Sequence, residues 1–189
     1  MQHDPFHRLP ADAVTVLPVG QGAVIFRQGD RATGLFRVIR GSVVLRRATA
    51  TGAPVVLHRA TTGQLFAEAS VFSAEYHCDA VCTQDGDVAR IDKAAVAQAL
   101  RADPDFAESF ARLLAVQVQQ YRQILELMSI QSARDRVLSA VHSGLLSGSV
   151  VEFSARIGLT HEACYRALRR LVDEGRLVKT ARGRYGPKP

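Results

Sequence analysis

The chain has 189 residues, of which 47% are hydrophobic, which is enough to bury the cores of one medium and one small domain. Its formal net charge of +6 arises in residues 129–189, which hold 11 Lys or Arg against 5 Asp or Glu, because residues 1–128 balance at 13 against 13. A segregated basic segment is typical of a polyanion binder, so double-stranded DNA is the expected partner.

The composition also excludes several classes of protein. No apolar run approaches the ~20 residues of a membrane-spanning helix, and the first residues lack the pattern of a signal peptide. Three cysteines, an odd number, argue against a disulfide framework. The sequence contains no paired acid and base, activated nucleophile, Walker loop or closed metal motif, so we expect no enzyme. We expect a cytoplasmic protein without membrane contact.

The segment from Val14 to Ile91 contains short apolar runs that glycine and proline separate. Their length and spacing are typical of strands in an antiparallel barrel or sandwich. The runs are Ala23–Phe26, Gly34–Ile39, Ser42–Leu45, Pro54–Leu57, Ala80–Cys82 and Val88–Ile91. Turns are expected at Gly22, Gly29, Gly34, Gly41, Gly52 and Gly63.

Pro104 to about Ile130 has the pattern of one long helix. Apolar residues recur at alternating spacings of four and three, which is the seam of a coiled coil. The seam is Ala107, Ala111, Leu114, Val118, Tyr121, Leu125 and Met128. A seam of this length normally needs a partner, so we expect a homodimer with an interface formed by Leu114, Val118, Tyr121, Leu125 and Met128. Phe106, Phe110, Leu113 and Ile124 lie off the seam, and a helix buried within its own monomer is the alternative.

Residues 151–172 predict two helices with a turn at Gly158, which is the pattern of a helix-turn-helix motif. We expect Thr160 to cap the second helix, and Glu162 in its first turn favours the positive end of the helix dipole. Gly175 is expected to end this helix. The predicted buried stripe is Ala163, Ala167, Leu168 and Leu171.

The exposed faces of the second helix carry side chains of the kinds that read base edges or contact phosphates. These are His161, Glu162, Tyr165, Arg166, Arg169 and Arg170. Beyond Gly175 the chain predicts two short strands about a turn near Arg182, a basic wing that carries Lys179, Arg182 and Arg184. The alternative is a helical hairpin whose charges only solvate its surface.

The stretches GAVIFRQGD, residues 22–30, and GLFRVIRGSVVL, residues 34–45, resemble the opening strands of cyclic-nucleotide-binding domains. With the long helix and the winged motif behind them, the chain resembles the cyclic-AMP receptor protein and fumarate-nitrate regulator (Crp/Fnr) superfamily of bacterial transcription regulators, over about Val14 to Tyr185. The resemblance implies an α+β fold with a jelly-roll-type antiparallel barrel as sensor domain in residues 1–103, a dimerisation helix and hinge in 104–130, and a winged helix-turn-helix in 131–189. It also implies RNA polymerase as a partner, and base reading by His161, Glu162 and Arg166.

Residues 66–80 lie where the cyclic-AMP-binding members have their phosphate-binding cassette. Glu68 matches the acid that bonds the ribose, but Cys78 and Asp79 replace the Arg-Ser pair that holds the cyclic phosphate. Arginine offers phosphate a bidentate charged contact, whereas aspartate repels it, and the nearest basic residues in the sequence are Arg59 and Arg90. We therefore expect an effector other than cyclic AMP, or none. The candidate pocket residues are Glu68, Ser70, His77, Cys78 and Asp79, and a purely structural role of Glu68 is the alternative.

His77, Cys78 and Cys82 offer ligands for a soft metal or haem, or thiols for oxidation sensing. In a single strand, Cys78 and Cys82 would share a face but lie about 13 Å apart, and His77 would point to the other face. A redox-, metal- or haem-responsive sensor is thus the alternative to buried core cysteines and a surface histidine. No cysteine precedes Gly22, so we expect no iron–sulfur cluster of the fumarate-nitrate type.

Overall fold

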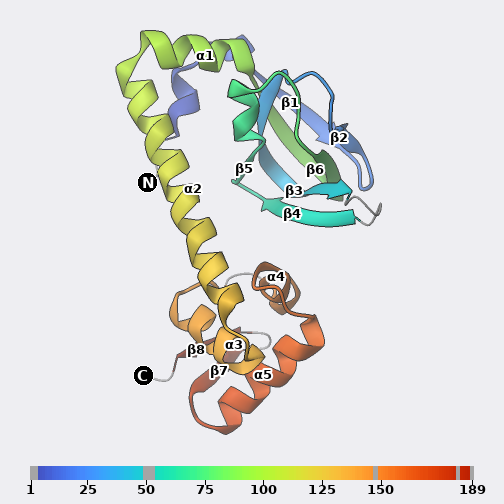
Figure 1. Cartoon of the computed structure of the whole chain (residues 1–189), viewed down its shortest axis with the longest axis vertical. Coiled ribbons are helices and arrows are strands. Elements are labelled where there is room, and N and C mark those ends of the chain that lie inside the picture. The colour runs from blue at the N-terminus through green and yellow to red at the C-terminus, as the bar shows by residue number, and fades with distance from the viewer. Residues whose placement is uncertain (1–3, 49–53, 147–148, 182–183, 188–189) are drawn as a thin grey trace. The chain divides into compact units, whose positions relative to one another are not determined.

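The computed structural model describes residues 4–48, 54–146, 149–181 and 184–187. The fold is α+β, and the chain divides into two compact units, Met1–Arg112 and Leu113–Pro189 (Figure 1). Antiparallel strands dominate the first unit, while the second contains the C-terminal part of a long helix, three shorter helices and a two-stranded sheet. No helix in the described residues is long and apolar enough to span a membrane.

The sheet of the first unit has the strand order β1-β6-β3-β4. These strands are β1 (Val14–Val19), β6 (Asp79–Asp92), β3 (Gly34–Ala48) and β4 (Pro54–Thr61), and two short strands, β2 (Val24–Phe26) and β5 (Leu65–Phe66), pair with β6 and β3. The predicted antiparallel architecture is confirmed. Within the described residues no pairing joins β1 to β4, however, so the expected barrel is not closed.

Two pairs of predicted runs form single long strands. The runs on either side of Gly41 both lie in β3, and those on either side of Gly86 both lie in β6. Gly41 has φ +94° and lies among register shifts between the two strands, and a Cβ added to Gly86 would lie 1.8 Å from the carbonyl oxygen of Arg40. The expectation of turns at Gly34 and Gly41 is therefore wrong, because Gly34 is the first residue of β3 and Gly41 forms an irregularity that bends the pair. Gly52 lies outside the described residues.

Aromatic rings fill the space between the sheet and the cassette. Phe26 stacks on Tyr76 with ring centroids 3.8 Å apart, and Phe36 stacks on Phe66 at 5.1 Å. All four side chains are buried. The Tyr76 hydroxyl donates to the carbonyl oxygen of Gly34 at 2.9 Å, so the ring is fixed at both its face and its tip.

Two helices follow the sheet, α1 (Lys93–Ala102) and α2 (Pro104–Ser129). The Asp92 carboxylate caps α1 by accepting from the amide of Ala95 at 2.9 Å. A short 3₁₀ helix, η1 (Pro5–Arg8), places Phe6 edge-on to Phe106 and Phe110, with centroids 6.2 Å from each. A second one, η2 (Ala11–Ala13), leads into β1. The two phenylalanines thus pack within the first unit, as their position off the seam suggested.

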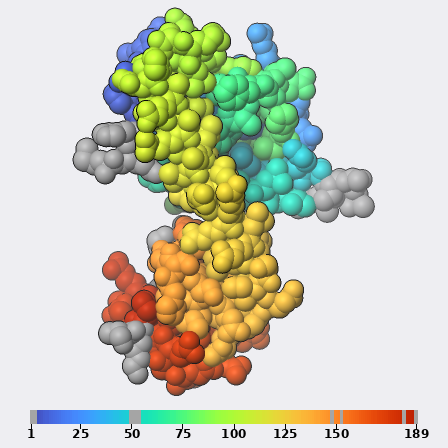
Figure 2. Space-filling model, turned by 60° about the vertical axis from the view of Figure 1, so that its left-hand side comes forward, coloured from blue at the N-terminus to red at the C-terminus, as the bar shows by residue number. Residues whose placement is uncertain are grey.

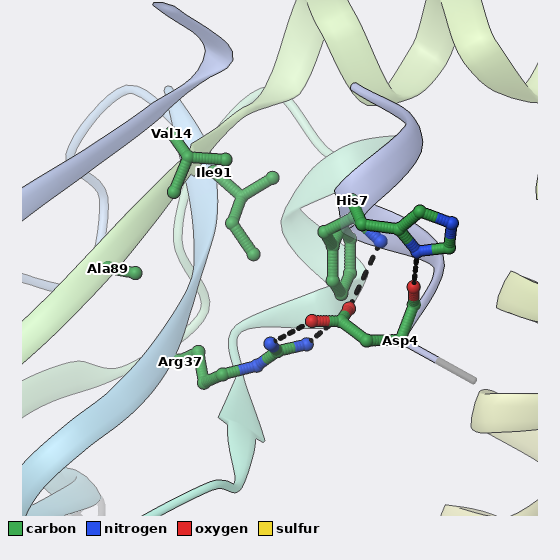
Figure 3. A pocket seen from close by; sticks show the side chains of 7 residues that line it. Asp4, His7, Val14, Arg37, Ala89 and Ile91 are labelled. Atoms are coloured by element: carbon green, nitrogen blue, oxygen red, sulfur yellow. Dashed lines mark hydrogen bonds and ion pairs between the residues drawn. The ribbon is translucent and has the colours of Figure 1, made fainter. Parts of the chain in front are cut away.

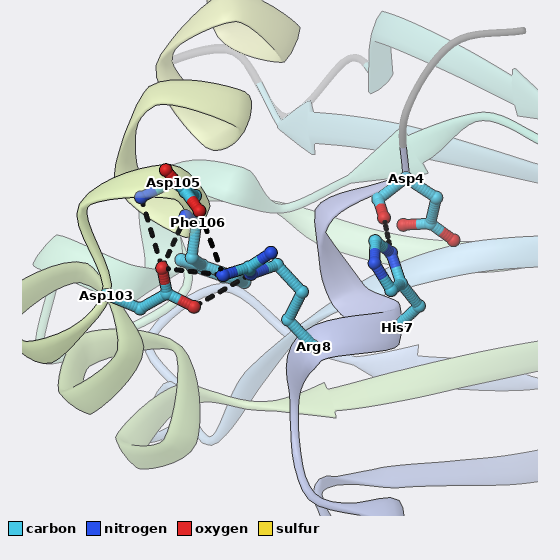
Figure 4. A network of polar contacts seen from close by, with 6 residues as sticks. All are labelled: Asp4, His7, Arg8, Asp103, Asp105 and Phe106. Atoms are coloured by element: carbon cyan, nitrogen blue, oxygen red, sulfur yellow. Dashed lines mark hydrogen bonds and ion pairs between the residues drawn. The ribbon is translucent and has the colours of Figure 1, made fainter.

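Ion pairs hold η1 on both sides. Arg8 donates to Asp103 at 2.8 Å and to Asp105 at 3.2 Å, at the start of α2 (Figure 4). Asp4 accepts a bidentate contact from Arg37 of β3 beside a small hollow of about 210 Å³ (Figure 3). Arg37 also lies over the Phe6 ring, 5.2 Å from its centroid.

The second unit contains α3 (Ala133–His142), α4 (Val150–Arg156) and α5 (His161–Asp173), followed by the hairpin β7 (Leu177–Ala181) and β8 (Arg184–Pro187). This is the predicted helix-turn-helix with its wing. The largest buried side chains of its core are Phe153, Ile157, Leu168, Leu171 and Leu177. In α5, Cys164 takes the core position that we expected for Ala163, which is only half-buried.

Candidate nucleic-acid interface and effector cassette

The turn between α4 and α5 is formed by local backbone contacts. Gly158 has φ +67°, and the amide of Leu159 returns to the carbonyl oxygen of Ser154 at 2.9 Å. The Thr160 hydroxyl accepts from the amide of Ala163 at 3.2 Å, which confirms the predicted cap. Gly175, with φ +68°, follows the last turn of α5, where an end was predicted.

Arg136 of α3 ties this turn to the end of α2, a role that sequence reasoning missed. Its guanidinium donates to the carbonyl oxygens of Ile130 at 2.7 and 3.0 Å and of Met128 at 3.3 Å. It also donates to those of Ile157 at 3.2 Å and Gly158 at 3.3 Å. Backbone acceptors cannot be recognised in a sequence, so no motif could have indicated this contact.

The face of α5 turned away from the core is polar and exposed. It presents the six predicted residues His161, Glu162, Tyr165, Arg166, Arg169 and Arg170. The backbone amide at the start of the helix holds the pKa of the Glu162 carboxyl below its usual value, and the Thr160 hydroxyl adds to this effect. Glu162 is therefore ionised at neutral pH.

Arg170 differs from its neighbours because its charge is neutralised. Its guanidinium lies 2.9 Å from Glu174, which Arg134 of α3 also contacts at 2.6 Å. Together these contacts lower the pKa of Glu174, with Arg134 as the larger cause.

The wing lies beside α5, and the two enclose a hollow of about 500 Å³. Its lining consists of Tyr165, Arg166, Arg169, Val172, Lys179 and Tyr185. Lys179 is paired with Tyr185 across the hairpin, and Arg184 is exposed near its tip. Arg182 lies outside the described residues. Tyr185 was not among the predicted site residues, and only the fold brings it next to Tyr165.

Near the start of the cassette, Ala67 has φ +60° and precedes a 3₁₀ helix, η3 (Glu68–Phe72). Its candidate residues do not point to one centre. Ser70 is buried and donates to the carbonyl oxygen of Gly34 at 2.7 Å, and Asp79 accepts from the amide of Gln28 at 2.9 Å. His77 is exposed.

Two arginines of β3 lie against the end of the cassette. Arg46 is the cross-strand partner of Asp79, and its guanidinium lies 3.8 Å from that carboxylate. Arg47 donates twice to the carbonyl oxygen of His77, at 2.6 and 2.9 Å. The nearest arginines in the sequence, Arg59 and Arg90, are not the ones that the fold places here. Which arginines lie beside the cassette depends on the register between β3 and β6, and the sequence does not reveal that register.

The three cysteines are free thiols in separate settings. Burial raises the pKa of the Cys78 thiol, although Arg47 opposes the shift. Cys82 is buried and donates to the carbonyl oxygen of Gln84 at 3.0 Å, and burial raises the pKa of Cys164 to about 11. Across the described ranges, no three His, Cys, Asp or Glu side chains are close enough together to hold a metal ion.

His58 of β4 is a cassette neighbour that the sequence did not single out. Burial lowers the pKa of its imidazole, while the charge of Glu68 acts in the opposite direction. The charge of Glu68 thus acts on His58, although the two residues belong to different elements.

Helix α2 lies at the molecular surface (Figure 2, yellow). One side of it carries large apolar side chains that are exposed. Leu125 is 66% exposed and Val118 is 45% exposed, and Tyr121 and Met128 are also exposed. Leu114 is half-buried. The seam is thus open along most of its length.

Comparison with known proteins agrees with this architecture. The model of the cyclic nucleotide-binding domain matches residues 16–103. A cyclic AMP receptor protein of Thermus thermophilus is 31% identical over 163 residues, which cover 82% of this chain and 76% of that protein. The chain belongs to the Crp/Fnr family of transcription regulators.

Solved structures of the Crp/Fnr family share the fold. FixK2 of Bradyrhizobium japonicum covers 93% of both chains with a TM-score of 0.68 at 18% identity. The catabolite activator protein of Thermus thermophilus covers 97% of this chain and 92% of its own, with a TM-score of 0.53 at 27% identity. The winged helix-turn-helix described above corresponds to this family architecture.

Proposed function

We propose that the chain is a homodimeric regulator that binds double-stranded DNA in a sequence-specific manner and does not respond to cyclic AMP. The observation that carries this proposal is the exposed face of α5, where arginines follow a capped N-terminus behind a helix-turn-helix turn. Such a helix enters the major groove with its first residues at the base edges. RNA polymerase is the further partner that family membership suggests.

We assign base reading to His161, Glu162 and Arg166, which lie in the first two turns of α5. An arginine contacts guanine through two hydrogen bonds, and a carboxylate accepts from cytosine. Arg169, Lys179 and Arg184 are assigned to phosphates. Arg170 contributes less, because Glu174 already neutralises its guanidinium.

Selection of genomic fragments by the purified protein, followed by fluorescence anisotropy on the selected duplex, tests DNA binding. We expect a near-palindrome with half-site centres about 10 bp apart. Arg166→Ala should weaken cognate binding by roughly 1–3 kcal/mol and relax discrimination at one base position. Equal loss on cognate and random DNA would remove the base-reading role of Arg166.

We assign the dimer interface to the open seam of α2, formed by Leu114, Val118, Tyr121, Leu125 and Met128. When two such helices pair, the apolar side chains at this spacing are buried against those of the partner helix. In a monomer the same side chains form an apolar stripe that is exposed to water. Sedimentation should give a dimer at micromolar concentration, and Val118→Glu with Leu125→Glu should give a monomer that binds its operator weakly. The control is Arg122→Glu, off the seam. A monomeric unaltered protein would contradict the assignment.

We also propose that cyclic AMP does not regulate the protein. Cys78 and Asp79 stand where the family has its phosphate-holding pair, and the contacts of Asp79 with Gln28 and Arg46 satisfy that carboxylate within the protein. A cyclic phosphate would have to approach this carboxylate. Calorimetry with millimolar cyclic AMP should therefore give no saturable heat, and operator affinity should not change. Saturable binding would refute this part of the proposal.

A further inference from the structure

Arg136 of α3 contacts the ends of two other helices at once. Its guanidinium donates to the carbonyl oxygens of Met128 and Ile130, which lie in the last turn of α2 and directly after it. It also donates to those of Ile157 and Gly158, which directly follow α4. Carbonyl groups at a helix C-terminus lack intrahelical partners and carry the negative end of the helix dipole, so a cation stabilises them. One side chain therefore caps both helices.

The shape of the guanidinium makes this double cap rigid. All three of its nitrogens donate, with Nε and Nη2 directed toward the end of α2 and Nη1 toward the end of α4. Because the N–H groups of arginine point in fixed directions within one plane, the two sets of carbonyl groups are held at one relative orientation. The ammonium group of lysine has no such fork and cannot reproduce both sets of bonds. Arg136 thus fixes the angle between the end of α2 and the turn that leads into α5.

Apolar packing reinforces the same joint. Leu127 of α2 is 4% exposed and belongs to the core of the second unit, together with Phe153 of α4. The methyl group of Met128 lies against Gly158, since a Cβ added to that glycine would lie 2.8 Å from it. Met128 is also the last residue of the seam that is assigned to the dimer interface. The proposed interface thus ends directly beside the helix-turn-helix turn.

We propose that Arg136 sets the spacing between the two half-sites that the dimer accepts. This inference rests on the proposed dimer and its DNA binding, and it makes Arg136 a positioning residue whose donors are bonded within the protein. In a dimer joined along α2, the separation of the two α5 helices depends on the angle between each α2 and its helix-turn-helix. One base pair inserted between the half-sites moves them apart by ~3.4 Å and rotates one against the other by about 35°. A rigid joint rejects such a site, whereas a loose joint can follow it.

The test uses the full-length protein and operator duplexes that differ only in the number of base pairs between the half-sites. Fluorescence anisotropy gives the affinity for each duplex. For the unaltered protein, we expect the addition or removal of one base pair to weaken binding by about tenfold. In Arg136→Met this spacing penalty should fall to about threefold or less, because the angle of the joint is no longer fixed. A base change inside one half-site should cost the same factor in both proteins, since base reading by α5 is not altered.

The ratio between two spacings separates positioning from stability. A variant whose second unit is only less stable binds every duplex more weakly by one common factor, which leaves the ratio unchanged. Arg134→Met on the same helix is the matched control, because it removes an ion pair with Glu174 and should keep the full spacing penalty. Arg136→Lys, which keeps the charge but not the fork, should also lower the penalty. It decides the question if Arg136→Met does not fold.

The possible outcomes distinguish this inference from the proposed function. If the unaltered protein binds no duplex specifically, or is a monomer, the proposed function fails. If it binds its operator as a dimer but the folded variants of Arg136 keep the full spacing penalty, only the inference fails. An unaltered dimer that binds all spacings equally would overturn it as well. An equal loss of base discrimination in Arg136→Met would also contradict it, because Arg136 would then maintain the shape of the motif itself.

Discussion

Arg136 offers the sharpest test of how the helix-turn-helix is held in place. Replacing it with methionine keeps the apolar stem but removes the five hydrogen bonds to the carbonyl oxygens of Met128, Ile130, Ile157 and Gly158. Hydrogen bonds from a charged donor contribute roughly 1.5–3 kcal/mol each, but three of these five are longer than 3.1 Å and two share one acceptor. We therefore expect a net loss of about 3 kcal/mol in the free energy of unfolding of the second unit.

Hydrogen exchange measured by mass spectrometry over residues 150–173 is the appropriate assay, because it isolates this unit from the first. Arg136→Met should accelerate exchange of the turn amides, and Arg136→Lys should restore part of the protection. The matched control is Arg134→Met on the same helix, which removes a solvent-exposed ion pair with Glu174 and should leave the exchange rate of the turn amides almost unchanged. Turn amides that exchange at the unaltered rate in Arg136→Met would refute the reasoning.

Four further predictions follow from single contacts. Phe6→Ala should destabilise the first unit by about 3–5 kcal/mol in urea unfolding, because its ring is 5% exposed. The contact with Arg37 lowers the pKa of Asp4, so this pair should stabilise the fold above about pH 4 and lose that effect as pH falls through the lowered pKa; Asp4→Asn should flatten this part of the acid-unfolding curve. Gly158→Ala should destabilise the turn by at least about 1 kcal/mol, since φ is +67° and the new Cβ would lie 2.8 Å from the Met128 methyl, and circular dichroism on heating would reveal it. The Cys164 thiol, with its pKa raised to about 11, should react with a disulfide reagent at pH 8 only after unfolding.

The second unit was the part most predictable from the sequence. Thr160 and Gly175 bracket α5 with strong local signals for a cap and a stop, and both were located correctly. Helical spacing alone does not distinguish Ala163 from Cys164 as the core position. Only the packing of α5 on its neighbours decides between them, and it buries the thiol.

The first unit was less predictable because glycines in a bent strand resemble glycines in a turn. In the sequence, Gly41 and Gly86 separate four short apolar runs. In the structure, each glycine lies within one long strand, and the two strands pair closely at this point. The position of the cassette was predicted from the resemblance, but the residues that contact it were not predicted. Arg46 reaches Asp79 through strand register, and register depends on pairing across many residues.

One carbonyl group at the start of β3 suggests how such a cassette can diverge. The carbonyl oxygen of Gly34 accepts from both Ser70 and Tyr76, so two points of the cassette are tied to a single backbone atom. The acceptor is a backbone atom, which every residue type carries, but only glycine fits at this position, because a Cβ added to Gly34 would lie 2.3 Å from the carbonyl oxygen of Ile91. Neither anchor involves the side chain of Cys78 or Asp79, so substitutions at these two positions should leave the bonds of Ser70 and Tyr76 to Gly34 in place.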